Sequence, residues 1–215
     1  MTVLVTGANR GIGRGLLDHY RATGRAALGT ARAPEGDLLP LDVTDPASHA
    51  GLAARLAGRP IDLLVCNAGV YLDRGHRLGD GLSPELWARA FAVNVTGVFL
   101  TVETCLPNLR AAQGAKIAIL SSQMASHTRA PGGSYIYRAS KAAVLNLGRN
   151  LATDLRREGI AVGIYHPGWV RTDMGGQGAD IAVETAVAGL AARFAALSPE
   201  TTGVFESWDG SPMPF

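Results

Sequence analysis

Tyr137 and Lys141 have residue types and a spacing that suit proton transfer. Residues four positions apart on a helix lie one above the other on the same face. An ammonium group beside a phenol stabilises the phenolate, so we expect Lys141 to lower the pKa of Tyr137 from its ordinary value of about 10. A tyrosine of this kind can act as a general acid or base near neutral pH. Tyr135 is the competing tyrosine, but Ala139 and not a lysine lies four residues after it.

A glycine-rich turn near the start of the chain gives a second, independent indication. The apolar residues 3–5 predict a short buried strand, and apolar residues at helical spacing follow the turn. Gly7, Gly11 and Gly13 lie between the two. Glycines in a strand-to-helix turn let the backbone approach a pyrophosphate closely, and the helix N-terminus offers it free N–H groups. The spacing Gly-x-x-x-Gly-x-Gly differs from the Gly-x-Gly-x-x-Gly dinucleotide fingerprint.

The bulk composition predicts one globular domain that spans residues 1–215. The chain has 215 residues, 47% of them hydrophobic, and no linker-like segment divides it. Its net charge of +2 comes from scattered residues and gives no reason to expect a nucleic-acid or membrane partner. No apolar stretch reaches membrane-spanning length by this inspection, and the N-terminus has no signal-peptide pattern. We therefore expect a cytoplasmic protein.

The cysteines and histidines do not predict a metal site. Cys66 and Cys105 have no metal-ligand spacing and lie in apolar surroundings, and the five histidines share no such spacing either. We expect the two cysteines to be buried free thiols of a reducing compartment.

Short apolar segments alternate with helical ones along the chain. The expected strands are residues 3–5, 26–30, 38–41, 61–66, 116–120 and 162–165, with an edge strand at 204–205. The expected helices are one after the glycine turn and residues 52–56, 84–106, 137–155 and 181–194. Strands that alternate with helices imply βαβ crossovers. We therefore predict an α/β fold, a single doubly wound Rossmann-type domain whose parallel sheet is flanked by helices on both faces.

Small or polar residues follow the end of each predicted strand. In sheets of this kind, ligands bind beyond the carboxyl ends of the strands, near the switch in strand order. The clusters are Thr6 to Gly13, Thr30 to Arg32, Asp42-Val43, Asn67-Ala68-Gly69, Ser121-Ser122 and His166-Pro167-Gly168. Six such strand ends in one chain predict a cofactor cleft at this edge of the sheet.

These residues together resemble the short-chain dehydrogenase/reductase family, and the resemblance covers essentially the whole chain. The motifs appear in family order as Thr6-Gly-x-x-x-Gly-x-Gly13, Asn67-Ala-Gly69, Asn94, Ser122, Tyr137-x-x-x-Lys141 and Pro167-Gly168. Within the family, residues 133–141 and 166–176 and the Asp209-Gly210 pair are most similar to C-factor and sniffer-type carbonyl reductases. The resemblance implies a nicotinamide dinucleotide cofactor.

The resemblance also implies a role for each catalytic candidate. Tyr137 would protonate a carbonyl oxygen as hydride arrives, or deprotonate the alcohol in the reverse direction. Lys141 would lower the tyrosine pKa and hydrogen-bond the nicotinamide ribose. Ser122 would hold the substrate oxygen by supplying a donor where charge develops, and it is preferred to Ser121, which alternation places on the opposite face. Asn94 would support a water molecule that links Lys141 to solvent.

The residues after the second strand favour NADP(H) over NAD(H). An acidic residue there binds the ribose hydroxyls of NAD, whereas arginine suits the 2′-phosphate of NADP. Arg32 follows this strand, no carboxylate comes before Glu35, and Arg10 lies within the glycine turn. Guanidinium groups bind phosphate with a bidentate fork, although either arginine is also compatible with a solvated loop position. The further cofactor contacts that the resemblance implies are Gly7, Asn9, Gly11, Ile12, Gly13, Asp42, Val43, Asn67, Ala68, Gly69, Tyr137, Lys141, Pro167, Gly168, Val170 and Thr172.

The leading functional prediction is an NADP(H)-dependent oxidoreductase that transfers hydride between nicotinamide and a carbonyl or secondary alcohol. We expect a small-molecule substrate, and the resemblance implies a homodimer or homotetramer. The alternative is a non-catalytic dinucleotide-binding signalling or sensor protein of the C-factor type. The presence of all four catalytic candidates favours the enzyme. Trp169, Met174 and the pair Gly175-Gly176 lie where the family carries its substrate lid.

Overall fold

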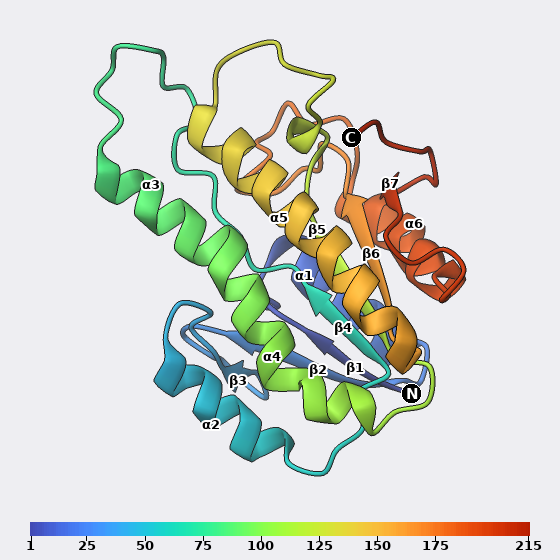
Figure 1. Cartoon of the computed structure of the whole chain (residues 1–215). Helices are drawn as coiled ribbons and strands as arrows, with labels where there is room; N and C mark the ends of the chain where they lie inside the picture. Colours follow the sequence, from blue (N-terminus) through green and yellow to red (C-terminus); the bar gives the residue numbers. More distant parts are fainter.

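A seven-stranded sheet in which every strand pair is parallel forms the centre of the molecule (Figure 1). The computed structural model describes all 215 residues. The strand order is β3-β2-β1-β4-β5-β6-β7, so the order switches between β1 and β4. The strands are β1 (Thr2–Val5), β2 (Ala26–Ala31), β3 (Leu39–Pro40), β4 (Leu63–Cys66), β5 (Lys116–Leu120), β6 (Ala161–His166) and β7 (Phe205–Ser207). The predicted doubly wound α/β fold with a parallel sheet is confirmed.

Helices cover both faces of this sheet. They are α1 (Gly11–Ala22), α2 (Pro46–Leu56), α3 (Pro84–Phe91), α4 (Gly97–Arg110), α5 (Tyr135–Leu155) and α6 (Val183–Ala196). Successive residues of β1 point to opposite faces, as a strand requires. Val3 and Val5 are buried in one core with Leu190 of α6, whereas Leu4 is buried in the other core with Val144 of α5. Helices α1 and α6 therefore cover one face, and α2, α4 and α5 cover the other.

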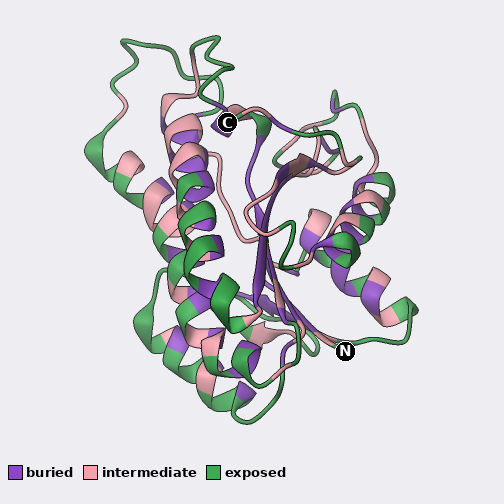
Figure 2. Ribbon diagram, turned by 45° about the vertical axis from the view of Figure 1, so that its right-hand side comes forward, coloured by how far each residue is buried: buried purple, intermediate pink, exposed green.

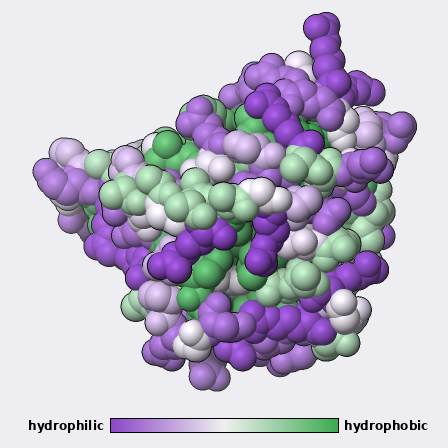
Figure 3. All heavy atoms as spheres, turned by 90° about the horizontal axis from the view of Figure 1, so that it is seen from below, coloured by the Kyte–Doolittle hydropathy of each residue, from purple (hydrophilic) through white to green (hydrophobic).

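The central strands β1, β4, β5 and β6 are buried on both faces, which explains their apolar composition. Figure 2 shows the strands buried, and the helices buried toward the sheet and exposed on their outer sides. All four residues of β4 are buried, so its sequence Leu-Leu-Val-Cys is apolar without alternation. Seen from below the view of Figure 1, the surface is mixed, with hydrophilic residues predominating and hydrophobic ones in small groups between them (Figure 3).

The helix predicted over residues 84–106 is present but has three parts. Between α3 and α4, residues Ala92–Thr96 form a π-helical turn, a feature that often marks functional positions. Gly97 follows this turn, and a Cβ atom there would lie 2.8 Å from Cγ2 of Val43. The glycine thus lets the helix lie directly against the loop after β3.

The expectation that no segment reaches membrane-spanning length was wrong. The continuous helical stretch Pro84–Arg110 is long and apolar enough by length and composition, with a mean hydropathy of 1.4. It extends four residues past its predicted end. The apolar character of this helical stretch has a structural reason. It contributes Val98, Val102, Cys105 and Leu109 to the core between the sheet and helices α2, α4 and α5.

Other boundaries differ for local reasons. Helix α2 begins at Pro46, six residues before its predicted start, because the Asp45 carboxylate accepts hydrogen bonds from the N–H groups of Ala47 at 2.9 Å and Ser48 at 3.3 Å. Helix α5 begins two residues earlier than predicted and α6 two residues later. The two cysteines are free and buried, as predicted.

Candidate active site

The turn after β1 requires glycine at three positions, because of backbone conformation or close packing. Gly7 and Gly11 have φ angles of 64° and 55°, in the left-handed region that favours glycine. A Cβ atom on Gly13 would lie 2.3 Å from the carbonyl oxygen of Gly7. Helix α1 begins at Gly11, and its N-cap residue Arg10 makes no capping side-chain hydrogen bond. The bare backbone and the open helix N-terminus fit the pyrophosphate of a dinucleotide.

The end of β4 is joined to this turn across the switch in strand order. The Asn67 side-chain amide donates to the carbonyl oxygens of Thr6 at 2.8 Å and Gly7 at 3.1 Å. The Thr6 hydroxyl accepts from the N–H groups of Asn67 and Ala68 at 3.0 and 3.1 Å. A Cβ atom on Gly7 would lie 3.0 Å from Cα of Ala68. Asn67 and Ala68, predicted cofactor contacts, therefore also hold the glycine turn in shape.

Tyr137 and Lys141 lie on one face of α5, as their spacing predicts, and both are buried. The Lys141 ammonium lies 5.7 Å from the centroid of the Tyr137 ring. It donates a 2.9 Å hydrogen bond to the carbonyl oxygen of Leu120, at the end of β5. Helix α5 and strand β5 together position the pair.

The expected direction of the tyrosine pKa was wrong. Burial raises the pKa of Tyr137 above its ordinary value, and the nearby Ser122 side chain opposes this only in part. Burial also lowers the pKa of Lys141, from 10.5 to about 8. Because the pair shares a dry environment, burial disfavours both charged forms, and the ammonium is held toward a backbone carbonyl instead of the phenol oxygen. Tyr137 is consequently a protonated phenol near neutral pH.

The two serines after β5 face different partners. Ser122 is buried beside the Tyr137 phenol, whose pKa it lowers, and its hydroxyl oxygen accepts from the N–H group of Met124 at 3.1 Å. Ser121 instead donates to the backbone carbonyl oxygen of Lys141 at 3.1 Å. The serine chosen from the sequence is thus the one beside the phenol, and its neighbour supports the helix that carries the lysine.

Asn94 lies at the centre of the π-helical turn and is buried. Its amide donates to the carbonyl oxygen of Val70 and the hydroxyl of Ser140, both at 2.9 Å, and its oxygen accepts from the Val70 N–H group at 2.8 Å. Gly69 sits between this side chain and Lys141, since a Cβ atom on Gly69 would lie 3.3 Å from the Asn94 oxygen and 3.6 Å from the Lys141 nitrogen. Asn94 therefore joins the loop after β4 to α5, and its predicted role toward water stays a prediction.

The predicted phosphate-binding arginines lie at the surface. Arg10 forms a 2.5 Å ion pair with Asp173, in the segment after β6, and both side chains are exposed. Arg32 is exposed directly after β2. The carboxylate of Asp42 accepts from the N–H group and hydroxyl of Thr44 at 2.9 and 2.7 Å, which lowers its pKa. Asn9 is exposed beside Arg10.

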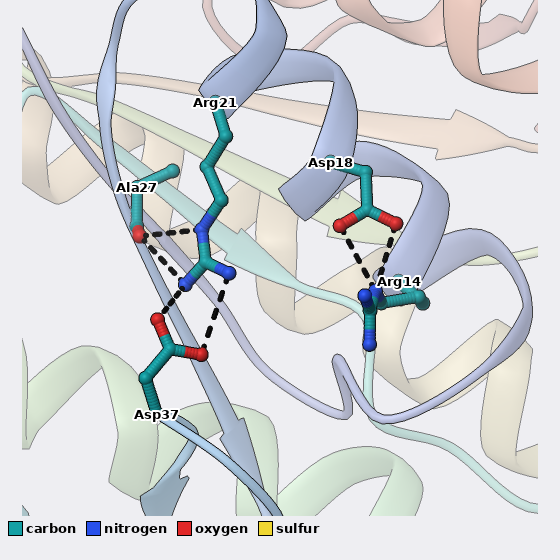
Figure 4. A network of polar contacts seen from close by, with 5 residues as sticks. All are labelled: Arg14, Asp18, Arg21, Ala27 and Asp37. Carbon is teal, nitrogen blue, oxygen red and sulfur yellow. Dashed lines mark hydrogen bonds and ion pairs between the residues drawn. The ribbon is translucent and has the colours of Figure 1, made fainter.

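A polar network on α1 holds the loop that carries Arg32 (Figure 4). Arg21 donates to the carbonyl oxygen of Ala27 on β2 at 3.3 Å and to the Asp37 carboxylate at 2.7 Å. Figure 4 shows the Arg21 side chain between these two partners. Asp37 therefore joins the C-terminal end of this loop to α1. Arg32, at the N-terminal end of the loop, forms no ion pair.

The segment after β6 crosses above the glycine turn. Gly168 has a φ of 87°, and a Cβ atom there would lie 2.4 Å from Cδ1 of Ile181. Val170 is buried beyond Pro167. A Cβ atom on Gly11 would lie 3.3 Å from Cγ2 of Thr172, so this predicted cofactor contact covers the turn directly. Ile12 in the first turn of α1 is half-buried against the core.

Sequence reasoning missed the residues that follow Val70. Tyr71 stacks on the Tyr137 ring, with centroids 4.1 Å apart and an interplanar angle of 18°. The buried Asp73 carboxylate accepts from backbone N–H groups of α5. Arg74 donates to the carbonyl oxygens of Met174 at 2.7 Å and Gly175 at 3.0 Å, and so joins this loop to the segment after β6. No local pattern marks these contacts, because their partners are 63 or more residues away.

Comparisons with known proteins identify the family of the chain. The family described as short chain dehydrogenase matches residues 1–180. The chain belongs to the short-chain dehydrogenase/reductase family. As a short-chain dehydrogenase/reductase it is an NAD(P)-dependent oxidoreductase, and the family resemblance predicted from the sequence is confirmed.

Three proteins illustrate the likeness within the short-chain dehydrogenase/reductases. C-signal of Myxococcus xanthus is 37% identical over 164 residues, which are 76% of this chain and 98% of that protein. The NADPH-bound carbonyl reductase from chicken fatty liver is 33% identical, with a TM-score of 0.90 and coverage of 100% of this chain and 98% of the other. The carbonyl reductase Sniffer of D. melanogaster is 26% identical, with a TM-score of 0.92 and coverage of 100% and 99%.

Proposed function

We propose that this protein is an NADP(H)-dependent carbonyl reductase in which Tyr137 donates the proton that accompanies hydride transfer. The observation that carries the proposal is the convergence of Ser122, Tyr137 and Lys141 in one buried cluster at the carboxyl edge of the sheet that also bears the glycine turn. NADPH, when bound, supplies the hydride. The likeness to an NADPH-bound carbonyl reductase over the whole chain supports this assignment.

The chain's own residues account for the proton. A buried phenol with a raised pKa stays protonated near neutral pH, so its proton is available to a carbonyl oxygen that gains negative charge. Ser122, which lies beside the Tyr137 phenol, offers the carbonyl oxygen a second donor at the position where negative charge develops. Lys141 is charged below about pH 8 and stabilises the tyrosinate left after donation. Asn94 fixes the loop after β4 against α5 and, in this proposal, supports the water that returns a proton.

The preference for NADP(H) rests on the charges after β2 and in the glycine turn. Arg32 is exposed at the end of β2 and has no acidic residue beside it before Glu35. Arg10 is held on the other side by Asp173, in an exposed ion pair of the kind that contributes only about 0 to 1 kcal/mol. A 2′-phosphate carries more charge than one carboxylate and can compete for this guanidinium. We therefore propose Arg10 and Arg32 as the two sides of the phosphate site.

A screen of NADPH oxidation over ketones, aldehydes and quinones tests the function. We expect turnover of at least one small carbonyl compound, and a loss of about 10²- to 10⁴-fold in Tyr137→Phe. Tyr135→Phe is the matched control, because Tyr135 lies on the same helix two residues away and has no lysine four residues later. NADPH binding without turnover of any carbonyl would instead support a signalling protein, which the likeness to C-signal makes the second candidate.

A further inference from the structure

The N-terminus of the catalytic helix α5 does not cap itself. The three preceding residues Gly132, Gly133 and Ser134 have φ angles of 85°, 69° and 49°, all in the left-handed region. An ordinary N-cap residue is extended, and its side chain accepts from an N–H group of the first turn. Ser134 is left-handed and makes no such bond. The first N–H groups of α5 therefore need an acceptor from elsewhere.

Asp73, in the loop after β4, supplies this acceptor. Its two carboxylate oxygens accept from the N–H groups of Ile136 at 2.8 Å and Tyr137 at 3.1 Å. Asp73 is 1% exposed and forms no ion pair, so the N-terminus of α5 is its only compensating partner. Hydrogen bonds from backbone N–H groups to a buried carboxylate are charge-assisted, and the helix dipole favours an anion at this end.

Tyr71 holds the same turn through its ring and its hydroxyl. Its ring stacks on Tyr137 at 4.1 Å between centroids, and its hydroxyl hydrogen-bonds the Ser134 side chain. Tyr71 thus covers one face of the Tyr137 ring. The ammonium group of Lys141, on the same helix as Tyr137, also lies over this ring. Two residues of one loop therefore contact the proposed proton donor, Asp73 at its backbone and Tyr71 at its ring.

We propose that Asp73 and Tyr71 are positioning residues for Tyr137. The Asp73 carboxylate fixes the first turn of α5, which carries Tyr137, and Tyr71 fixes the Tyr137 ring. The proposal rests on the proposed function, because it explains how the proposed proton donor is held. Displacing a proton donor by about 1 Å can lower the reaction rate about 10²-fold, so these contacts should affect catalysis.

The groups that surround Tyr137 come from three elements. Lys141 is on α5, Ser122 follows β5, and Tyr71 and Asp73 lie in the loop after β4. Ser122 lowers the pKa of Tyr137, whereas Tyr71 and Asp73 raise it in addition to the larger effect of burial. Removal of the Asp73 charge should accordingly lower the pKa of Tyr137, and a purely structural cap would not have this effect.

Steady-state kinetics of Asp73 and Tyr71 variants provides the first test. In Asp73→Ala we expect kcat for carbonyl reduction to fall about 10- to 100-fold with KM changed by less than about threefold, because the donor and not the binding site is displaced. Asp73→Asn keeps one acceptor oxygen and should recover part of the loss. Tyr71→Leu should lose more than Tyr71→Phe, which keeps the stacked ring. Asp80→Asn is the control, since this exposed carboxylate of the same loop accepts only from Arg77.

A titration separates positioning from folding and from the function itself. The pKa of Tyr137 can be followed by NMR of tyrosine labelled with ¹³C at Cζ, with the signal assigned by its absence in Tyr137→Phe, and this requires no turnover. We expect Asp73→Asn to lower that pKa and Asp80→Asn to leave it unchanged. An unchanged Tyr137 pKa and an unchanged kcat in folded Asp73→Asn and Asp73→Ala would overturn the proposal. A wild-type protein without turnover would refute the proposed function alone, and the titration would still decide the role of Asp73.

Discussion

Replacing Lys141 by methionine should stabilise the protein while it removes activity. Burial lowers the pKa of the Lys141 ammonium from 10.5 to about 8. At about 1.36 kcal/mol per pKa unit, the folded state disfavours the charged ammonium by roughly 3 kcal/mol. Methionine also leaves the carbonyl oxygen of Leu120 without its 2.9 Å hydrogen bond, at a cost of about 1 to 2 kcal/mol. We expect a net gain of roughly 1 to 2 kcal/mol in the free energy of unfolding near neutral pH.

This gain has a defined dependence on pH. The folded-state pKa of Lys141 lies below its unfolded value, so the penalty is fully present below pH 8, shrinks as the pH rises, and is absent above 10.5. The advantage of Lys141→Met over the wild type should therefore disappear across this interval. Urea unfolding followed by tryptophan fluorescence, at one protein concentration and several pH values, measures it.

Lys116 provides the matched control, because it is the other lysine of the chain. Its ammonium donates to the carbonyl oxygens of Phe194 and Ala195 at the end of α6, at 3.2 and 2.7 Å. Partial burial also lowers the pKa of Lys116, but this ammonium is half-exposed and lies at a helix C-terminus, where a cation is favoured by about 0.3 to 1 kcal/mol. Lys116→Met should therefore gain clearly less stability than Lys141→Met. A Lys141→Met protein that is destabilised equally at every pH would refute the view that the site holds this ammonium at an energetic cost.

Three further predictions follow from the glycine turn, the arginines and the phenol. Gly13→Ala should abolish measurable NADPH binding in a fluorescence titration, because its Cβ atom would lie 2.3 Å from the Gly7 oxygen. Gly51 in α2 has open space around it and provides the control. Gly51→Ala should bind NADPH normally and gain up to about 1 kcal/mol of stability. Arg32→Ala should raise the KM for NADPH about tenfold or more and leave that for NADH nearly unchanged, since a charge-assisted phosphate contact contributes about 1.5 to 3 kcal/mol; equal effects on both cofactors would contradict this. The rate of alcohol oxidation should keep rising with pH beyond the ordinary tyrosine pKa of about 10, because burial raises the pKa of Tyr137, and a plateau near neutral pH would contradict a raised Tyr137 pKa in the complex with cofactor and substrate.

Features that depend on a short stretch of chain were predictable from the sequence. The glycine turn is one such feature, since Gly7, Gly11 and Gly13 are required by local φ angles and by contacts of the turn with itself. The Tyr137 and Lys141 pair is another, because four residues on one helix determine a shared face. The parallel sheet with helices on both faces also follows from alternating strands and helices.

Features that depend on distant partners were not predictable in this way. Lys141 was expected to lower the tyrosine pKa, but the burial of both groups, which only the packed structure defines, reverses the direction for Tyr137. The Arg10 guanidinium pairs with Asp173, 163 residues along the chain. Asp73 caps a helix 63 residues later, and no local sequence pattern marks this partner. Long-range packing therefore accounts for the parts of the site that the sequence left open.

Deuterium transfer from NADPH labelled at the nicotinamide C4 position tests the central claim most directly. Mass spectrometry of the alcohol formed from a carbonyl substrate reports whether the label reaches the carbinol carbon. We predict stoichiometric label in the product of the wild type and of Tyr135→Phe, with the rate of labelling reduced about 10²- to 10⁴-fold in Tyr137→Phe. Unlabelled product, or equal rates of labelling in Tyr137→Phe and the wild type, would contradict the assignment of Tyr137 as the proton donor of a hydride-transfer site.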